Sequence, residues 1–234
     1  ANTYASAKLA DYLAPIQLGV GVKGGAEAAA HAARRFLSQM PSDNFIMKLD
    51  FSNAFNTLRR DAMLEAVHNL APEIFNFCLL AYNQSSYLNF RGFRILSEEG
   101  SQQGDPLGPL LFAITAHPIL LSLKSRFAAG YLDDFTAGDV GAVLADDFDR
   151  ICDLAGKIGL SLNIKKCEII SKCGFDNLPQ QFKDFRKVDP GECELLGAPL
   201  LNDVGLLDAL DDKCRDLLRA TSRLERLTSH DALL

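Results

Sequence analysis

The chain has 234 residues, of which 48% are hydrophobic, and its formal net charge at pH 7 is −6. This length and apolar content are enough for one domain with a buried core, and they exclude a fibrous or intrinsically disordered protein. A net negative charge also argues against a chain whose whole surface binds nucleic acid, because phosphate contacts require Lys and Arg.

The negative charge is concentrated in the second part of the chain. Residues 1–126 hold 11 Lys and Arg against 10 Asp and Glu, whereas residues 127–234 hold 13 against 20. Some of the excess acids can therefore be metal ligands, and one face of the protein can still be positive enough to contact nucleic acid.

Neither the cysteines nor the apolar segments indicate secretion or a membrane. The six cysteines are scattered without a CxxC pair, so zinc-ligand spacing is absent and we expect reduced, intracellular thiols. The most apolar stretch, residues 107–123, is interrupted by polar residues and is shorter than the roughly 20 residues of a membrane span. The chain starts at Ala1 without a signal-peptide pattern, so we expect a fragment of a longer reading frame that does not contact a membrane.

The first part of the chain predicts two helices, a glycine-rich link and a strand. We expect a weak helix over residues 1–13, a glycine-rich passage over 15–25 and an alanine-rich helix from Ala26 to Met40. The apolar run 45–51 then predicts a buried strand that presents Asp50 at its C-terminal end.

The middle of the chain predicts a helical pair followed by a hairpin. The helices cover Arg60–Leu70 and Pro72–Tyr82, and the second starts with proline at a first-turn position. Two short strands, Ser86–Phe90 and Phe93–Ser97, flank Arg91-Gly92 as a plausible hairpin turn.

A buried helix and an Asp-Asp pair between strands come next. We expect Asp105 as the N-cap and Pro106 as the first residue of the long apolar helix. Residues 127–139 predict two small apolar strands on either side of Leu132-Asp133-Asp134.

The last part of the chain mixes helices and short strands. We expect a helix over 140–158 that ends at Gly159, a strand or hairpin over 160–163 and 167–171, a strand over 194–196 and an amphipathic helix over 206–227. Helices and hairpins without regular βαβ alternation indicate an α+β fold with a mainly antiparallel sheet.

Three aspartates carry the candidate chemistry. Asp50 ends a buried strand, and Asp133 and Asp134 lie between two apolar strands. An adjacent Asp pair in a turn is most often only solvated, but buried strands on both sides would fix this turn in place. Carboxylates held together raise one another's pKa unless a cation neutralises them, and Mg²⁺ suits such a site because it takes carboxylates together with substrate phosphates. Two such ions about 3.5–4 Å apart can hold both oxygens of an in-line phosphoryl displacement.

Six sequence blocks, in order along the chain, resemble the motifs of reverse transcriptases from non-LTR (LINE-type) retrotransposons. They are a finger-region block at 17–25, motif A at 50–55, motif B at 100–109, motif C at 131–134, motif D at 159–168 and motif E at 195–197. The Tyr-any-Asp-Asp box of motif C is a weak signal alone. Six blocks in the right order make chance agreement very unlikely.

The resemblance implies the palm of a right-hand polymerase, an α+β fold in which an antiparallel sheet packs on helices. It divides the chain into partial fingers at 1–44, a palm at 45–200 and the start of a thumb or connection helix at 201–234. A hairpin near 83–100 is then an insertion between fingers and palm.

The resemblance also implies the catalytic groups. In the family, acids of motifs A and C hold two Mg²⁺ ions, with Mn²⁺ as a substitute, and these positions are Asp50, Asp133 and Asp134 here. The backbone carbonyl of Phe51 would complete one metal shell. Lys166 of motif D would donate a proton or a charge to the departing pyrophosphate, and Lys165 would take this role if the register slips by one.

Further positions match residues that contact the substrates in the family. Phe55 would exclude a ribose 2′-hydroxyl, Gln103 would lie against the incoming nucleotide, Gly104 would admit the template base and Tyr131 would pack near the primer end. Four arginines are candidate phosphate contacts, although exposed helix charges more often only interact with water: Arg34, Arg35, Arg59 and Arg60.

The sequence therefore predicts an RNA-directed DNA polymerase that joins dNTPs to a DNA primer on an RNA template. It would act within a longer retroelement polyprotein, inside the cell and in the nucleus by resemblance alone. One alternative is a catalytically silent nucleic-acid-binding or structural remnant, against which the retained acids argue. Another is an RNA-dependent RNA polymerase, against which Phe55 argues because such enzymes need room for the 2′-hydroxyl.

Overall fold

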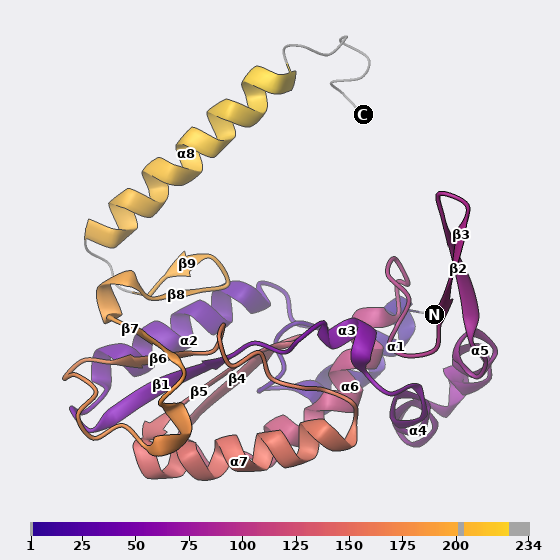
Figure 1. The fold of residues 1–234 in the computed structure, drawn as a ribbon, viewed down its shortest axis with the longest axis horizontal. Coiled ribbons are helices and arrows are strands. Elements are labelled where there is room, and N and C mark those ends of the chain that lie inside the picture. Colours follow the sequence, from indigo (N-terminus) through magenta and orange to yellow (C-terminus); the bar gives the residue numbers. More distant parts are fainter. Residues whose placement is uncertain (1, 201–203, 225–234) are drawn as a thin grey trace.

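A five-stranded sheet forms the centre of the protein, which is described here by a computed structural model of residues 2–200 and 204–224 (Figure 1). The strands follow the order β4-β5-β1-β6-β7 and are β1 (Asn44–Leu49), β4 (Phe127–Tyr131), β5 (Asp134–Val140), β6 (Glu168–Ser171) and β7 (Arg186–Val188). Neighbouring strands are antiparallel except β6 and β7, which are parallel. The predicted α+β fold with a mainly antiparallel sheet is confirmed.

Helices cover both faces of this sheet. In chain order, the helices of the described residues are α1 (Asn2–Leu13), α2 (Gly25–Gln39), α3 (Ala54–Thr57), α4 (Arg60–Leu70), α5 (Pro72–Tyr82), α6 (Gly108–Leu121), α7 (Gly141–Lys157) and α8 (Val204–Leu224), and not all of them lie on the sheet. Figure 1 shows α2 and α7 on opposite sides of the sheet. Side chains alternate along β1, so Phe45 and Met47 join the core under α6 and α7, whereas Ile46 joins a second core with α2.

Helix α6 lies almost entirely inside the protein. Every residue from Leu110 to His117 is buried, as the apolar run in the sequence predicted. None of the helices in the described ranges is both long and apolar enough to cross a bilayer. All six cysteines are free thiols.

The predicted cap of α6 is wrong. The helix begins at Gly108, with Leu107 as its N-cap, so Pro106 lies before the helix. The Asp105 carboxylate instead accepts a hydrogen bond from the Leu107 N–H at 2.8 Å and another from the Tyr82 hydroxyl. The bond to Tyr82 holds Asp105 against α5, and the chain makes one more turn before the helix starts.

The predicted strand at 160–163 is also wrong. These residues contribute only an isolated bridge between Leu162 and Phe51, and β6 pairs with β1 and β7 instead of forming a hairpin with them. The strand expected at 194–196 is β8 (Glu194–Leu195), which pairs with β9 (Ala198–Pro199). Two 3₁₀ turns, Gln180–Phe182 and Pro190–Glu192, precede it.

The hairpin and the last helix lie at the periphery (Figure 1). Strands β2 (Ser86–Phe90) and β3 (Phe93–Ser97) have the predicted bounds, and both turn residues, Arg91 and Gly92, have positive φ. Helix α8 confirms the predicted C-terminal helix, whose last three predicted residues, 225–227, lie outside the described ranges. The division into fingers, palm and thumb stays a prediction.

Candidate functional site

The three predicted catalytic aspartates lie at one edge of the central sheet, where β1 ends and β5 begins. The two strands are antiparallel and pair Leu49 with Phe135. The next position along each strand therefore brings Asp50 beside Asp134. Asp133 lies in the two-residue turn between β4 and β5, directly before Asp134. The register of the sheet thus gathers carboxylates that are distant in sequence.

The turn that carries Asp133 has an unusual backbone. Leu132, its first residue, has a φ of 56°, in the left-handed region that residues with a Cβ rarely enter. The buried side chain of Gln17 contacts this turn: it accepts a hydrogen bond from the Leu132 N–H at 2.8 Å and donates one to the Leu132 carbonyl at 3.2 Å. No role for Gln17 could be predicted from the sequence, because nothing local to residue 17 indicates a partner at 132.

The aspartates repel one another, and within the described residues none of them has a cationic partner in an ion pair. Partial burial raises the pKa of Asp133 above its ordinary value, and the charge of Asp50 adds to this effect. Burial is also the main cause of the raised pKa of Asp134, followed by the charge of Asp133, while Lys48 acts in the opposite direction. No ion pair in the described part of the chain involves any of the three carboxylates. This edge of the sheet therefore attracts cations.

A cavity of about 450 Å³ opens beside these acids. Its lining includes six of the nine predicted site residues: Asp50, Phe51, Phe55, Gln103, Asp133 and Lys166. A smaller cavity of about 190 Å³ contains Asp134 and shares Asp50 and Lys166 with the first. The structure thus brings seven of the predicted residues to two adjoining cavities.

Aromatic packing fixes one wall of the larger cavity. Phe55 is half-buried and stacks on Phe112 of α6, with ring centroids 4.8 Å apart. Phe51 is buried and meets Phe135 edge to face at 5.2 Å. Phe55 therefore packs against the core and lines the cavity at the same time, so core packing and the predicted contact with a sugar are compatible for this residue.

The backbone at Phe51 is placed by the isolated bridge to Leu162. Its two hydrogen bonds run from the Ser52 N–H to the Ser161 carbonyl and from the Asn163 N–H to the Asp50 carbonyl, both at 2.8 Å. This pattern does not use the Phe51 carbonyl, which leaves that oxygen available as the predicted metal ligand.

The remaining predicted substrate residues divide between the cavities and the surface. Lys166 lines both cavities, whereas Lys165 lines neither, which favours Lys166 for the motif D role. Gln103 also borders a third cavity of about 760 Å³ beneath the β2–β3 hairpin. Gly104 follows with a φ of 90°, and a Cβ at this position would meet no heavy atom of the described residues within 4 Å. Neither Gly104 nor Tyr131 lines the two cavities at the acids.

Three of the four candidate arginines have partners within the protein. Arg60 is only 7% exposed, and its guanidinium donates to three backbone carbonyls and one hydroxyl. The prediction that Arg60 contacts phosphate is therefore wrong. Arg34 donates twice to the Pro199 carbonyl. Arg59 and Arg35 are exposed, and Arg59 pairs with the neighbouring Asp61.

Two residues that the sequence analysis did not single out belong to the site. Lys48 of β1 lines the smaller cavity and pairs with Glu168 of β6 at 2.5 Å. Asn163 lines the larger cavity. A lysine within an otherwise apolar strand was the available signal for Lys48, because a charge there needs a partner.

Comparison with known sequences identifies the family. A family model described as reverse transcriptase (RNA-dependent DNA polymerase) matches residues 10–200. The chain is 28% identical to the retrovirus-related Pol polyprotein from type-2 retrotransposable element R2DM of Drosophila melanogaster, over 58% of this chain and 14% of that protein. It is 29% identical to the retrotransposable element SLACS 132 kDa protein of Trypanosoma brucei gambiense, over 68% and 14%. The chain therefore spans about one seventh of these relatives.

Solved structures agree on the fold. A telomerase from Candida albicans, in complex with the TWJ fragment of telomeric RNA, is similar with a TM-score of 0.53 and 15% identity, over 74% of this chain and 34% of that chain. The apo telomerase from Candida tropicalis is similar with a TM-score of 0.53 and 11% identity, over 73% and 36%. At such identities the likeness concerns the fold alone.

Proposed function

Because this chain belongs to the reverse transcriptase family, we propose that it is the RNA-directed DNA polymerase region of a non-LTR retrotransposon protein. The observation that carries the proposal is the cavity in which Asp50 and Asp133 meet Phe55, Gln103 and Lys166. These residues come from four separate sequence blocks. A decayed remnant would have no reason to keep them around one space.

The donor chemistry of the site fits a divalent cation such as Mg²⁺. Asp133 and Asp134, whose pKa values are raised and which have no ion-pair partner in the part of the chain that the structure describes, supply the hard oxygen ligands that such an ion prefers. Among the residues that the structure describes, no three acidic, His or Cys side chains form a ready-made metal cage. Substrate phosphates would complete the coordination, as is usual for Mg²⁺.

The proposed ligands are Asp50, Asp133, Asp134 and the Phe51 carbonyl. When bound, two such cations would neutralise the charge that develops on the attacking and leaving oxygens. The chain's own groups do the rest: the Phe55 ring would reject a ribose by size, and Gln103 would orient the incoming nucleotide. Lys166 borders both cavities and would stabilise the departing pyrophosphate.

The substrates follow from the same proposal. They are dNTPs, a DNA primer and an RNA template, with Gly104 at the template base and Tyr131 near the primer end. The chain would act as part of a longer retroelement polyprotein, in the nucleus of the cell.

Mg²⁺-dependent extension of a DNA primer on an RNA template tests this function. The Asp133→Asn variant should lose at least about 100-fold in rate, because groups that stabilise developing charge are worth that much. Asp146→Asn, an exposed acid on α7, is the matched control and should retain the wild-type rate. Equal rates for wild type and Asp133→Asn would contradict the assignment. No extension by the folded wild-type chain would favour the silent remnant.

A further inference from the structure

The segment between α1 and α2 docks onto the free edge of the central sheet, at the end of β4. The Leu18 N–H donates to the Gly130 carbonyl at 2.7 Å, and the Gly130 N–H donates to the Ile16 carbonyl at 2.8 Å. These bonds form a parallel bridge between Gln17 and Gly130. These bonds fix Gln17 beside the turn between β4 and β5, the turn that carries Asp133.

The Gln17 side chain makes three hydrogen bonds while fully buried. Its Oε1 accepts from the Leu132 N–H at 2.8 Å and from the Gly19 N–H at 3.0 Å, and its Nε2 donates to the Leu132 carbonyl at 3.2 Å. One amide therefore satisfies both backbone groups of Leu132. Leu132 is the turn residue with positive φ, a conformation that crowds a Cβ against the backbone.

The space around this amide depends on two glycines. A Cβ at residue 19 would lie 2.7 Å from the Leu132 backbone nitrogen, and one at residue 130 would lie 2.5 Å from a Leu120 methyl carbon and 3.2 Å from the Gln17 Nε2. Gly19 and Gly130 therefore permit the close approach of the two segments. Burial alone does not produce such an arrangement, because Asn44 is equally buried and its side-chain amide forms no hydrogen bond within the described residues.

We infer that Gln17 is a positioning residue, whose amide holds Leu132 in the left-handed conformation and so sets the place of Asp133 and Asp134. This role rests on the proposed function. Gln17 does not line the cavities at the acids and acts only through the turn. Without its hydrogen bonds, Leu132 would relax toward negative φ, and the following carboxylates would rotate away from Asp50.

The test compares Gln17→Met with Asn44→Leu in the full chain. Methionine keeps the length of the side chain but cannot make these hydrogen bonds. Asn44→Leu replaces a buried amide at the far end of β1 that has no hydrogen bond to any residue the structure describes. In Gln17→Met, hydrogen exchange at the Leu132 and Gly19 amides should become at least about 10-fold faster, with core amides of β1 unchanged. The control should leave these amides at wild-type rates.

Primer extension supplies the functional readout. Gln17→Met should lower kcat about 10- to 100-fold, as expected for misplaced reacting groups, while KM for dNTP stays within about threefold. If Gln17→Met does not fold, Gly19→Ala replaces it, because its Cβ displaces Leu132 while Gln17 remains. Wild-type kcat in these variants, or a loss no greater than in Asn44→Leu, would overturn the inference. A wild-type chain that extends no primer would instead contradict the proposed function.

Discussion

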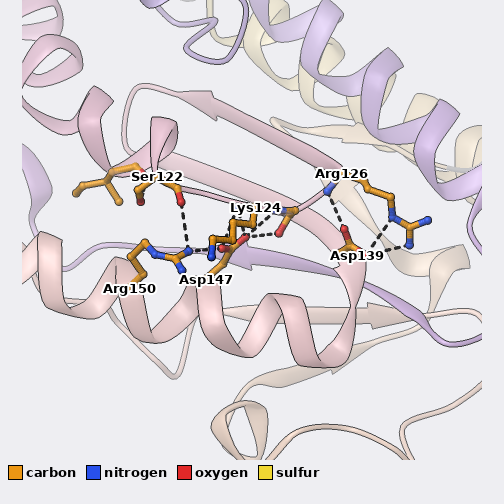
Figure 2. A network of polar contacts seen from close by, with 8 residues as sticks. Ser122, Lys124, Arg126, Asp139, Asp147 and Arg150 are labelled. Atoms are coloured by element: carbon orange, nitrogen blue, oxygen red, sulfur yellow. Dashed lines mark hydrogen bonds and ion pairs between the residues drawn. The ribbon is translucent and has the colours of Figure 1, made fainter.

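Strand β5 carries an aspartate near each end, and the fold surrounds the two carboxylates differently. At its start, Asp134 has a raised pKa and no ion pair within the described residues. Near its end, Asp139 accepts hydrogen bonds from the Arg126 N–H and Nε at 2.8 and 3.0 Å (Figure 2). It also accepts one from the Val140 N–H at 2.7 Å. Burial alone would raise the pKa of Asp139, but the bonds and charge of Arg126 bring it below its ordinary value.

A second satisfied carboxylate lies next to Asp139. Asp147 of α7 is fully buried and accepts from the backbone of Lys124 and Ser125 and from the Arg150 guanidinium at 2.7 Å. Figure 2 shows these groups converging between the strands and α7. The chain supplies donors to the acids that only hold the fold together. Among the described residues no side chain forms an ion pair with Asp134, so the acids of the site remain available to a bound ligand.

Asp147→Ala should have the largest effect on stability. It removes the acceptor of two backbone N–H groups and leaves Arg150 without its carboxylate partner, which costs about 3–5 kcal/mol. Denaturant unfolding measures this loss, and extension activity per folded molecule should be unchanged. A free energy of unfolding within about 1 kcal/mol of the wild-type value would mean that this network contributes little to stability.

Asp134→Asn should lower activity without lowering stability, which is the opposite of the result expected for Asp147→Ala. Extension activity should fall about 100-fold, equivalent to about 2.7 kcal/mol, because a proposed metal ligand is lost. Stability without divalent ions should stay equal or rise, since one of three repelling carboxylates is neutralised. Thermal unfolding in a chelator measures the second effect. A large loss of stability would show that Asp134 is held by the fold as Asp139 is.

Asp139→Asn should show, through the pH dependence of stability, that the folded structure lowers the pKa of Asp139. The folded pKa of Asp139 is lowered, so its stabilisation is present above the unfolded value of about 3.9 and is lost as pH falls through the folded value. Wild type should therefore exceed the variant by about 1–2 kcal/mol at pH 7, and the gap should close below about pH 4. Unfolding curves across this range measure the gap, and a constant gap would contradict the role of the charge.

Local patterns predicted the elements well where the partners are close in sequence. The hairpin around Arg91-Gly92 has the predicted bounds, because the glycine in the turn permits positive φ and the strands pair with each other. The helix from Pro72 also starts where its proline indicated. The acids of the site could be named in advance because motif A and motif C are compact blocks.

Distant partners account for most of what the sequence could not predict. The cap at Asp105 was misplaced because the Tyr82 hydroxyl comes from another helix. Strand β7 was missed because it has only three residues, two of them exposed charges, and depends on β6 for its pairing. The contact of Gln17 with Leu132 spans 115 positions, so no local pattern indicates it.

Asp153→Asn should have the smallest effect and defines the baseline. Asp153 pairs with Lys157 at 2.7 Å on the outer face of α7, but both side chains are 64% exposed. Water screens such a pair and the side chains lose freedom in forming it, so its removal should change stability by no more than about 0.5 kcal/mol. Denaturant unfolding beside Asp147→Ala measures the contrast on one helix. If both variants lost the same stability, burial and backbone donors would not be what separates the structural carboxylates from the exposed ones.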